Sequence, residues 1–218
     1  MMKRTFSAIT LCCLAVGAKA QYFTTSPYLS AGDSPLASGF LEDFEDGALN
    51  TPGVTASAGT VLGPAALTDS VDGDDGGIDG VGNRGSSWYV NQNSVTFTFD
   101  AQVLGSLPTF AGLVWTDVGF SDEGLGVGTV TFEAFDNNNV SLGVHTIGQL
   151  GDGVFGGQTA EDTLFGITSA TGISAITMTM GRSTDWEVDH LQYGAVPEPA
   201  TLAVLGLGAL ALIGRRRR

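Results

Sequence analysis

Short segments of β-type residues, separated by turn-forming residues roughly every ten positions, are the feature that most constrains the fold of this chain. In Val95–Phe99 (VTFTF), the alternation places Val95, Phe97 and Phe99 on one buried face. Ala111–Val118 is more continuously apolar, as a strand in the core of a sandwich is. The other segments of this type are 39–46, part of 50–63, 88–100, 127–136, 140–147, 163–168, 173–180 and 185–193.

These segments predict an all-β domain over residues 39–195, a single antiparallel β-sandwich of the jelly-roll kind. Asp136–Asn139 predicts a turn that joins two strands into a hairpin. Because no strand–helix–strand rhythm and no repeat of fixed period is found, a parallel α/β sheet, a solenoid and a propeller are not expected. Residues 21–38 are rich in turn residues, which predicts a loose N-terminal arm before the domain.

The N-terminal end of the chain has the features of an export signal. Lys3 and Arg4 precede an apolar stretch at 8–18, and Ala18-Lys19-Ala20 has the small-x-small pattern of a cleavage site. Residues 1–20 are therefore predicted to be a signal peptide with a helical apolar region.

The segment 196–218 combines three features in a fixed order. Pro197, Glu198 and Pro199 are followed by the apolar run 200–213 and then by Arg215, Arg216, Arg217 and Arg218. As a helix rising ~1.5 Å per residue, the apolar run covers roughly 21 Å, somewhat less than the ~30 Å hydrocarbon core of a bilayer. Because a cluster of arginines stays on the cytoplasmic side, the domain before Pro197 is expected outside the cytoplasm, joined to the membrane by this short C-terminal helix.

This order of features resembles the PEP-CTERM sorting signal of exported proteins in exopolysaccharide-producing Gram-negative bacteria. The resemblance implies export across the inner membrane, processing by an exosortase-type enzyme, and delivery to the cell envelope, cell surface or extracellular matrix. It implies nothing about the chemistry of the remaining domain. The alternative is a permanent tail anchor in which Pro-Glu-Pro occurs by chance.

The acidic composition limits the class of partner. Residues 21–195 hold all but one of the 23 acidic residues, whereas Arg84 and Arg182 are their only Lys or Arg. Nucleic acid and anionic lipid are therefore not expected as partners. Calcium, which prefers oxygen ligands, fits the composition. The alternative is that the acidity only keeps an exported protein soluble.

Two motifs resemble the jelly-roll lectin-like and carbohydrate-binding-module folds. They are Phe44–Gly47 (FEDG), in the first predicted strand, and Trp186–Tyr193 (WEVDHLQY), in the last. In that fold the first and last strands are neighbours and commonly share a structural calcium, so the resemblance implies calcium ligands at Glu45 and Asp189. The alternative is that these are exposed acids on edge strands, which discourage association between edges.

A second candidate calcium site is the loop 69–80. Its candidate ligands are Asp72, Asp74, Asp75 and Asp79. The loop departs from the EF-hand spacing, because Gly76 and Asn83 occupy positions that need side-chain ligands. The alternative is a flexible acidic turn, which runs of Asp and Gly commonly form.

Trp88 and Tyr89 form a candidate carbohydrate site beside this loop. Aromatic rings present a flat apolar face on which a sugar stacks. The alternative is that both rings only pack within the domain. Trp115, in the most apolar segment, is expected in the core.

No catalytic residue is assigned. His145 and His190 lie on different predicted strands, and the sequence has none of the local motifs of serine hydrolases, zinc proteases or P-loop enzymes. A glycosidase pair of Glu133 with Glu161 or Glu187 depends on a separation that only tertiary structure fixes.

These features predict an exported, non-catalytic protein of the surface or matrix, with a structural or adhesive role and calcium as a stabilising ion. The alternative is a lectin-like module that binds exopolysaccharide. A third possibility, from a different functional class, is a polysaccharide-processing enzyme.

Overall fold

The computed structural model describes residues 19–29, 33–35, 39–65, 67–71, 85–156 and 160–195. In chain order its strands are β1 (Gln21–Thr25), β2 (Phe40–Glu42), β3 (Val54–Ala56), β4 (Thr60–Leu62), β5 (Ser87–Val90), β6 (Ser94–Phe99), β7 (Phe110–Val118), β8 (Phe120–Ser121), β9 (Gly124–Leu125), β10 (Gly128–Phe135), β11 (Ser141–Leu150), β12 (Thr163–Thr168), β13 (Ala175–Met180) and β14 (Trp186–Gly194). One helical turn, α1 (Ala101–Leu104), follows β6.

No helix within the described residues is long and apolar enough to cross a membrane. The predicted signal helix and C-terminal helix lie outside the described residues.

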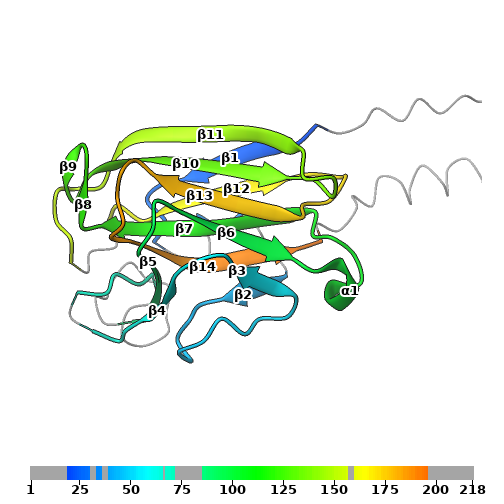
Figure 1. Cartoon of the computed structure of the whole chain (residues 1–218), viewed down its shortest axis with the longest axis horizontal. Helices are drawn as coiled ribbons and strands as arrows, with labels where there is room; N and C mark the ends of the chain where they lie inside the picture. The colour runs from blue at the N-terminus through cyan, green and yellow to red at the C-terminus, as the bar shows by residue number, and fades with distance from the viewer. Residues whose placement is uncertain are drawn as a thin grey trace, which may run out of the picture.

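The strands form two packed antiparallel sheets, as predicted (Figure 1). The seven-stranded sheet has the order β1-β12-β7-β14-β5-β4, with β2 also paired to β14, and the five-stranded sheet has the order β11-β10-β13-β6-β3. A small hairpin of β8 and β9 stands at one end of the sandwich, and α1 stands at the opposite end (Figure 1). The chain is therefore an all-β sandwich over its described residues.

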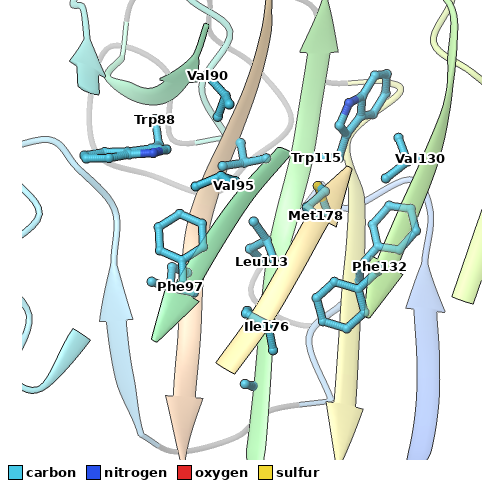
Figure 2. Packing of buried hydrophobic residues seen from close by; sticks show 14 of the residues in the cluster. Trp88, Val90, Val95, Phe97, Leu113, Trp115, Val130, Phe132, Ile176 and Met178 are labelled. Atoms are coloured by element: carbon cyan, nitrogen blue, oxygen red, sulfur yellow. The ribbon is translucent and has the colours of Figure 1, made fainter. Parts of the chain in front are cut away.

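The main core fills the space between the two sheets (Figure 2). Leu113 and Trp115 of β7, Phe132 of β10 and Ile176 of β13 are all fully buried in it. Along β10, buried and half-buried residues alternate, because successive side chains of a strand point to opposite faces. The burial predicted for the Val95–Phe99 face and for Trp115 is confirmed.

Strands from the two ends of the domain lie side by side. β2 pairs with β14, with Glu42 opposite Leu191 and Phe40 opposite Tyr193. The neighbouring first and last strands that the jelly-roll resemblance implied are therefore present.

The N-terminal arm is more ordered than the sequence predicts. Within 21–38, Gln21–Thr25 form β1, which pairs with β12 at the edge of the seven-stranded sheet. Tyr22 reaches the other sheet: its ring centroid lies 5.9 Å from that of Phe132, and its hydroxyl donates to the carbonyl oxygen of Gly143 at 2.5 Å. These long-range contacts stabilise a segment whose turn-rich composition gave no sign of them.

Two predicted strands are each divided between the two sheets. Residues 88–100 contain β5 and β6, and residues 50–63 contain β3 and β4; in each case the two strands belong to different sheets. The divisions fall at 91–93 (NQN) and 57–59 (SAG), where small and polar turn residues let the chain cross from one sheet to the other. The alternation of apolar and polar residues predicted β-strands here, but it did not predict the positions at which the chain passes from one sheet to the other.

Candidate functional site

The outer face of the seven-stranded sheet, which points away from the main core, carries buried acids. Along β14, Trp186 and Val188 point into the core, so Glu187 and Asp189 point to the outer face. Both carboxylates are nevertheless buried. The outer face must therefore be covered at this point.

Residues 67–71 provide the cover. The backbone N–H of Asp69 donates to Glu187 Oε2 at 2.9 Å, and that of Val71 donates to Asp189 Oδ2 at 2.9 Å. The Val71 side chain belongs to a second apolar cluster, separate from the main core, with Tyr28, Val114 and Leu164. Hydrogen bonds and apolar contacts thus hold the covering segment on the sheet.

Six carboxyl groups gather under or beside the covering segment, and we call them the acidic layer: Asp69, Asp117, Glu161, Asp162, Glu187 and Asp189. Burial raises the pKa values of Asp117, Glu161 and Glu187 to about 7 each. Burial, and then the negative charges of the neighbouring acids, raise the pKa of Asp69 to about 10. The same causes raise the pKa of Asp162 well above its ordinary value. The protein alone therefore stabilises the ionised form of these carboxyl groups poorly.

Asp189, a member of this layer, approaches Glu45, the acid of the other jelly-roll motif. The Ser70 hydroxyl lies 3.2 Å from Asp189 Oδ2 and 3.4 Å from Glu45 Oε1. Glu45 Oε1 also accepts a hydrogen bond from the backbone N–H of Ser86 at 2.5 Å. The fold brings Glu45 and Asp189 together through one hydroxyl, and calcium at this pair stays a prediction.

The second predicted calcium site lies outside the described residues, which include none of Asp72, Asp74, Asp75 and Asp79. Within the described ranges, no group of three or more His, Cys, Asp or Glu side chains is arranged to hold a metal ion. A cation in this part of the chain would therefore need hydroxyl, carbonyl or water ligands in addition to one or two carboxylates.

Trp88 is not the exposed sugar platform that the sequence predicts. It points from β5 into the main core and is only 8% exposed, beside Val90 (Figure 2). Its ring centroid lies 5.5 Å from that of Phe44, and its Nε1–H donates to the carbonyl oxygen of Ala58 at 3.0 Å. Because neighbouring residues of a strand face opposite sides, Trp88 and Tyr89 cannot both face solvent from β5.

Tyr89 points outward and stays half-buried. It lies opposite Thr60 of β4 and Glu187 of β14. Burial, and then the charge of Asp185 and its hydrogen bond with the phenol, raise the pKa of Tyr89. Of the two aromatic residues predicted to bind sugar, only Tyr89 is partly exposed, and sugar binding at this ring stays a prediction.

The candidate catalytic groups are separated as the sequence suggested. His145 lies on β11 of the five-stranded sheet, with Nε2 2.7 Å from the Thr24 hydroxyl, and His190 lies on β14 of the other sheet. Glu133 belongs to β10, also in the five-stranded sheet, so it does not share a face with Glu187. A glycosidase pair between Glu133 and Glu187 is therefore not supported by the fold.

Sequence reasoning passed over three members of the acidic layer, Asp69, Asp117 and Asp162. Asp117 carried a usable signal, because a charged residue inside a continuously apolar strand has to be buried or displaced by a bulge. Asp69 and Asp162 carried none, since each follows a polar residue in a loop and only the fold brings them together.

Comparison with protein families matches residues 195–218 to the PEP-CTERM protein-sorting motif. The chain carries this motif at its C-terminus, and the motif includes Pro197, Glu198 and Pro199. It indicates an exported protein associated with the cell envelope. Since β14 ends at Gly194, the motif begins directly after the last strand of the sandwich. No curated protein sequence matches the chain.

Among solved structures, the chain is similar to the N-terminal CBM22-1–CBM22-2 tandem domain of Xyn10C from Paenibacillus barcinonensis, with 14% identity, 77% of this chain covered and a TM-score of 0.34. The chain spans about half of that tandem, 50% of its length. It is also similar to the K3 cleaved adhesin domain of Lys-gingipain from Porphyromonas gingivalis W83, with 11% identity, 72% of this chain and 98% of that chain covered, and a TM-score of 0.34. No site residue is transferred from either structure.

Proposed function

We propose that this chain is an exported, non-catalytic β-sandwich protein of the cell surface or extracellular matrix, with a structural or adhesive role. An exosortase-type enzyme processes its C-terminal segment. The observation that carries the proposal is the sorting motif at 195–218, which follows β14 directly and so joins the folded domain to the sorting signal. The strong negative charge of the domain repels anionic surfaces and keeps the protein soluble, as a protein of a hydrated matrix needs to be.

Replacing Pro197, Glu198 and Pro199 together by alanine is expected to stop processing. The wild-type chain should reach the cell surface or medium in a shortened form, whereas the variant should stay uncleaved in the inner membrane. The measurement is cell fractionation with immunoblotting in a host that has an exosortase. An epitope placed in the turn 136–139 suits detection, because exposed loop tips tolerate insertion.

The matched control for this experiment is the triple alanine variant of Asn137, Asn138 and Asn139, with the epitope at another exposed turn. These residues form the exposed turn between β10 and β11, so the control should be processed like the wild type. If the motif variant is shortened and distributed like the wild type, processing at this motif is ruled out and the chain reaches the envelope by another route.

The alternative function is a lectin-like module, and the outward position of Tyr89 is the observation that favours it. The structural role predicts that Tyr89→Ala leaves the mobility of the protein in affinity electrophoresis through host exopolysaccharide unchanged. A retardation that is present in the wild type and lost in Tyr89→Ala, with an unchanged unfolding midpoint, would establish the lectin-like function instead. Tyr22→Phe, which keeps its ring against Phe132, is the control for a general effect of tyrosine loss.

Calcium at Glu45 and Asp189 is part of the proposal, as an ion that ties the first and last strands together. The approach of both carboxylates to the Ser70 hydroxyl supports it. Glu45→Gln is expected to weaken calcium binding, measured by titration calorimetry, without changing the sorting of the protein.

A further inference from the structure

The side-chain carboxyl groups of two members of the acidic layer, Asp69 and Asp162, are buried without a hydrogen-bond partner among the described residues. Both side chains are 0% exposed, and all four of their carboxyl oxygens lack a partner among the described residues. Glu187 differs, because its Oε2 accepts hydrogen bonds from the Asp69 backbone N–H and from the Ser87 hydroxyl. Buried polar groups in folded proteins are nearly always partnered, so these four oxygens call for a partner that the described side chains do not supply.

The register of the seven-stranded sheet places Asp162 beside Thr116. Thr163 of β12 pairs with Trp115 of β7, so the residue before Thr163 lies opposite the residue after Trp115. Thr116 lies at a register shift of β7 against β14, between Trp115, which is opposite Val188, and Asp117, which is opposite Glu187. Because a bulge interrupts the alternation of side chains, the direction of Trp115 does not fix the face to which Thr116 points. The Thr116 hydroxyl is buried, and it too has no hydrogen-bond partner among the described residues.

The covering segment brings a matching pair of groups from above the sheet. Thr68 directly precedes Asp69, and its hydroxyl is buried and unpartnered within the described residues. Asp69 is fixed in place by the hydrogen bond from its backbone N–H to Glu187. After burial, the charge of Asp69 is the largest cause that raises the pKa of Asp162, which places the two carboxyl groups within electrostatic reach of each other. Two buried carboxyl groups therefore lack partners where the covering segment meets the sheet. The hydroxyls of Thr68 and Thr116, at neighbouring positions, are buried without partners among the described residues as well.

The described side chains do not provide an arginine or lysine for these acids. The described ranges contain one lysine, Lys19, and one arginine, Arg182. Arg182 is exposed, and its Nε lies 3.6 Å from Asp122 Oδ2. Protonation of both acids would remove their charge but would add O–H donors that also need acceptors. A bound cation satisfies all four oxygens at once and removes the repulsion between the acids.

We propose that Asp69 and Asp162 bind a calcium ion between the outer face of the β12–β7 pair and the covering segment. The four unpartnered atoms of Asp69 and Asp162 are carboxyl oxygens, which favour a hard cation. The place is closed to solvent, and magnesium keeps several of its waters, so calcium fits better. Because fewer than three acids converge, backbone carbonyl oxygens, hydroxyls or enclosed water complete the coordination. This site is additional to the Glu45–Asp189 pair and does not depend on the proposed function.

The test is calcium titration of the full chain in mild detergent after treatment with a chelator, read by calorimetry and by thermal unfolding. In the wild type, calcium is expected to raise the unfolding midpoint by several degrees, since a ligand that binds only the folded state stabilises it. Asp162→Asn is expected to lower the calcium affinity at least about tenfold. In chelator the order is expected to reverse. Asp162→Asn should then unfold at the same temperature as the wild type or higher, because the amide replaces a buried carboxyl group that has no partner among the described residues and is repelled by the neighbouring acids.

Three control variants accompany this titration. Asp136→Asn changes a half-buried acid of the β10–β11 turn, in the other sheet, and should leave calcium binding unchanged. Glu45→Gln tests the Glu45–Asp189 pair, so the two calcium proposals fail independently. Arg84 lies outside the described residues, and Arg84→Gln should also leave the calcium affinity unchanged.

The proposal is overturned if calcium does not move the wild-type midpoint, or if Asp162→Asn binds calcium as tightly as the wild type. It is also overturned if Asp162→Asn lowers the unfolding midpoint by the same amount in calcium and in chelator. That result would indicate that the two acids share a proton and bind no calcium. If Arg84→Gln abolishes the difference between the wild type and Asp162→Asn, the partner is an arginine rather than a metal. Should Asp162→Asn fail to fold, Asp69→Asn replaces it in the same titration. Terbium luminescence then reports on ion binding, since the Tyr28 backbone N–H donates to the Asp162 carbonyl oxygen and an aromatic ring close to the site can sensitise the ion.

Discussion

Phe132→Ala is expected to lower the free energy of unfolding by about 3 to 5 kcal/mol, because it removes a fully buried ring and leaves a cavity between two sheets. Phe132 belongs to the main core (Figure 2), with its ring centroid 5.9 Å from that of Tyr22 of β1 and 6.1 Å from that of Phe165 of β12. The truncation therefore loosens contacts of both sheets and of the N-terminal strand. Urea unfolding measures the effect as a lower midpoint at an unchanged slope.

Phe120→Ala is the matched control for this substitution. Phe120 lies in the β8–β9 hairpin and is 64% exposed, so removing its ring should change the free energy of unfolding by less than about 0.5 kcal/mol. Equal losses in the two variants would mean that Phe132 does not sit in a closely packed core. A loss in Phe132→Ala that also lowers the slope would indicate a change in the compactness of the unfolded or native state.

Glu42→Ala is expected to lower the free energy of unfolding by about 2 to 4 kcal/mol, because one buried carboxylate organises the turn after β2. Glu42 Oε2 accepts hydrogen bonds from the backbone N–H of Asn50 at 2.9 Å and from the backbone N–H and hydroxyl of Thr51 at 2.9 and 2.6 Å. Glu42 Oε1 accepts another from the backbone N–H of Phe44 at 3.2 Å. Alanine leaves these donors without their acceptor, and only those near the surface can turn to water.

Two variants control this prediction by thermal and urea unfolding. Glu42→Gln keeps one carbonyl oxygen and the shape of the side chain, so its loss should be smaller than that of Glu42→Ala. Asp43→Ala removes a neighbouring acid that, among the described residues, accepts one hydrogen bond, from the Glu45 backbone N–H at 3.2 Å. This substitution should lower the free energy of unfolding by less than about 1 kcal/mol. The role assigned to Glu42 is wrong if Asp43→Ala is as destabilising as Glu42→Ala.

The fold was predictable where the relevant information is local in sequence. The alternation in Val95–Phe99 and the apolar run of β7 identified strands, and the turn residues of 136–139 identified the hairpin of β10 and β11. The order of the segments was enough for an antiparallel sandwich. The strand β1 was missed, because an edge strand of five residues gains its stability from β12 and from the contact of Tyr22 with the other sheet.

The candidate site was predictable only in part. The motifs FEDG and WEVDHLQY pointed to Glu45 and Asp189, and the fold brings both to Ser70. Within the segment 39–46, however, nothing in the order of acids distinguished the buried Glu42 from the exposed Glu45. Trp88 and Tyr89 posed the same difficulty. Which of two adjacent side chains faces the core depends on how the strand pairs with its neighbours, and the local sequence does not show this.

By itself the sequence determined that this chain is an all-β sandwich with a sorting motif after its last strand. Both properties are carried by patterns between near neighbours: a period of two along strands, and the order Pro-Glu-Pro, apolar run, arginines at the C-terminus. The tertiary structure alone decided where the chain crosses between sheets, which aromatic residue of β5 is buried, and that Asp69 and Asp162, far apart in the chain, are both fully buried. Whether an acid is buried depends on the strand register and on a covering segment from a distant part of the chain. The residues adjacent to the acid in sequence carry no information on either.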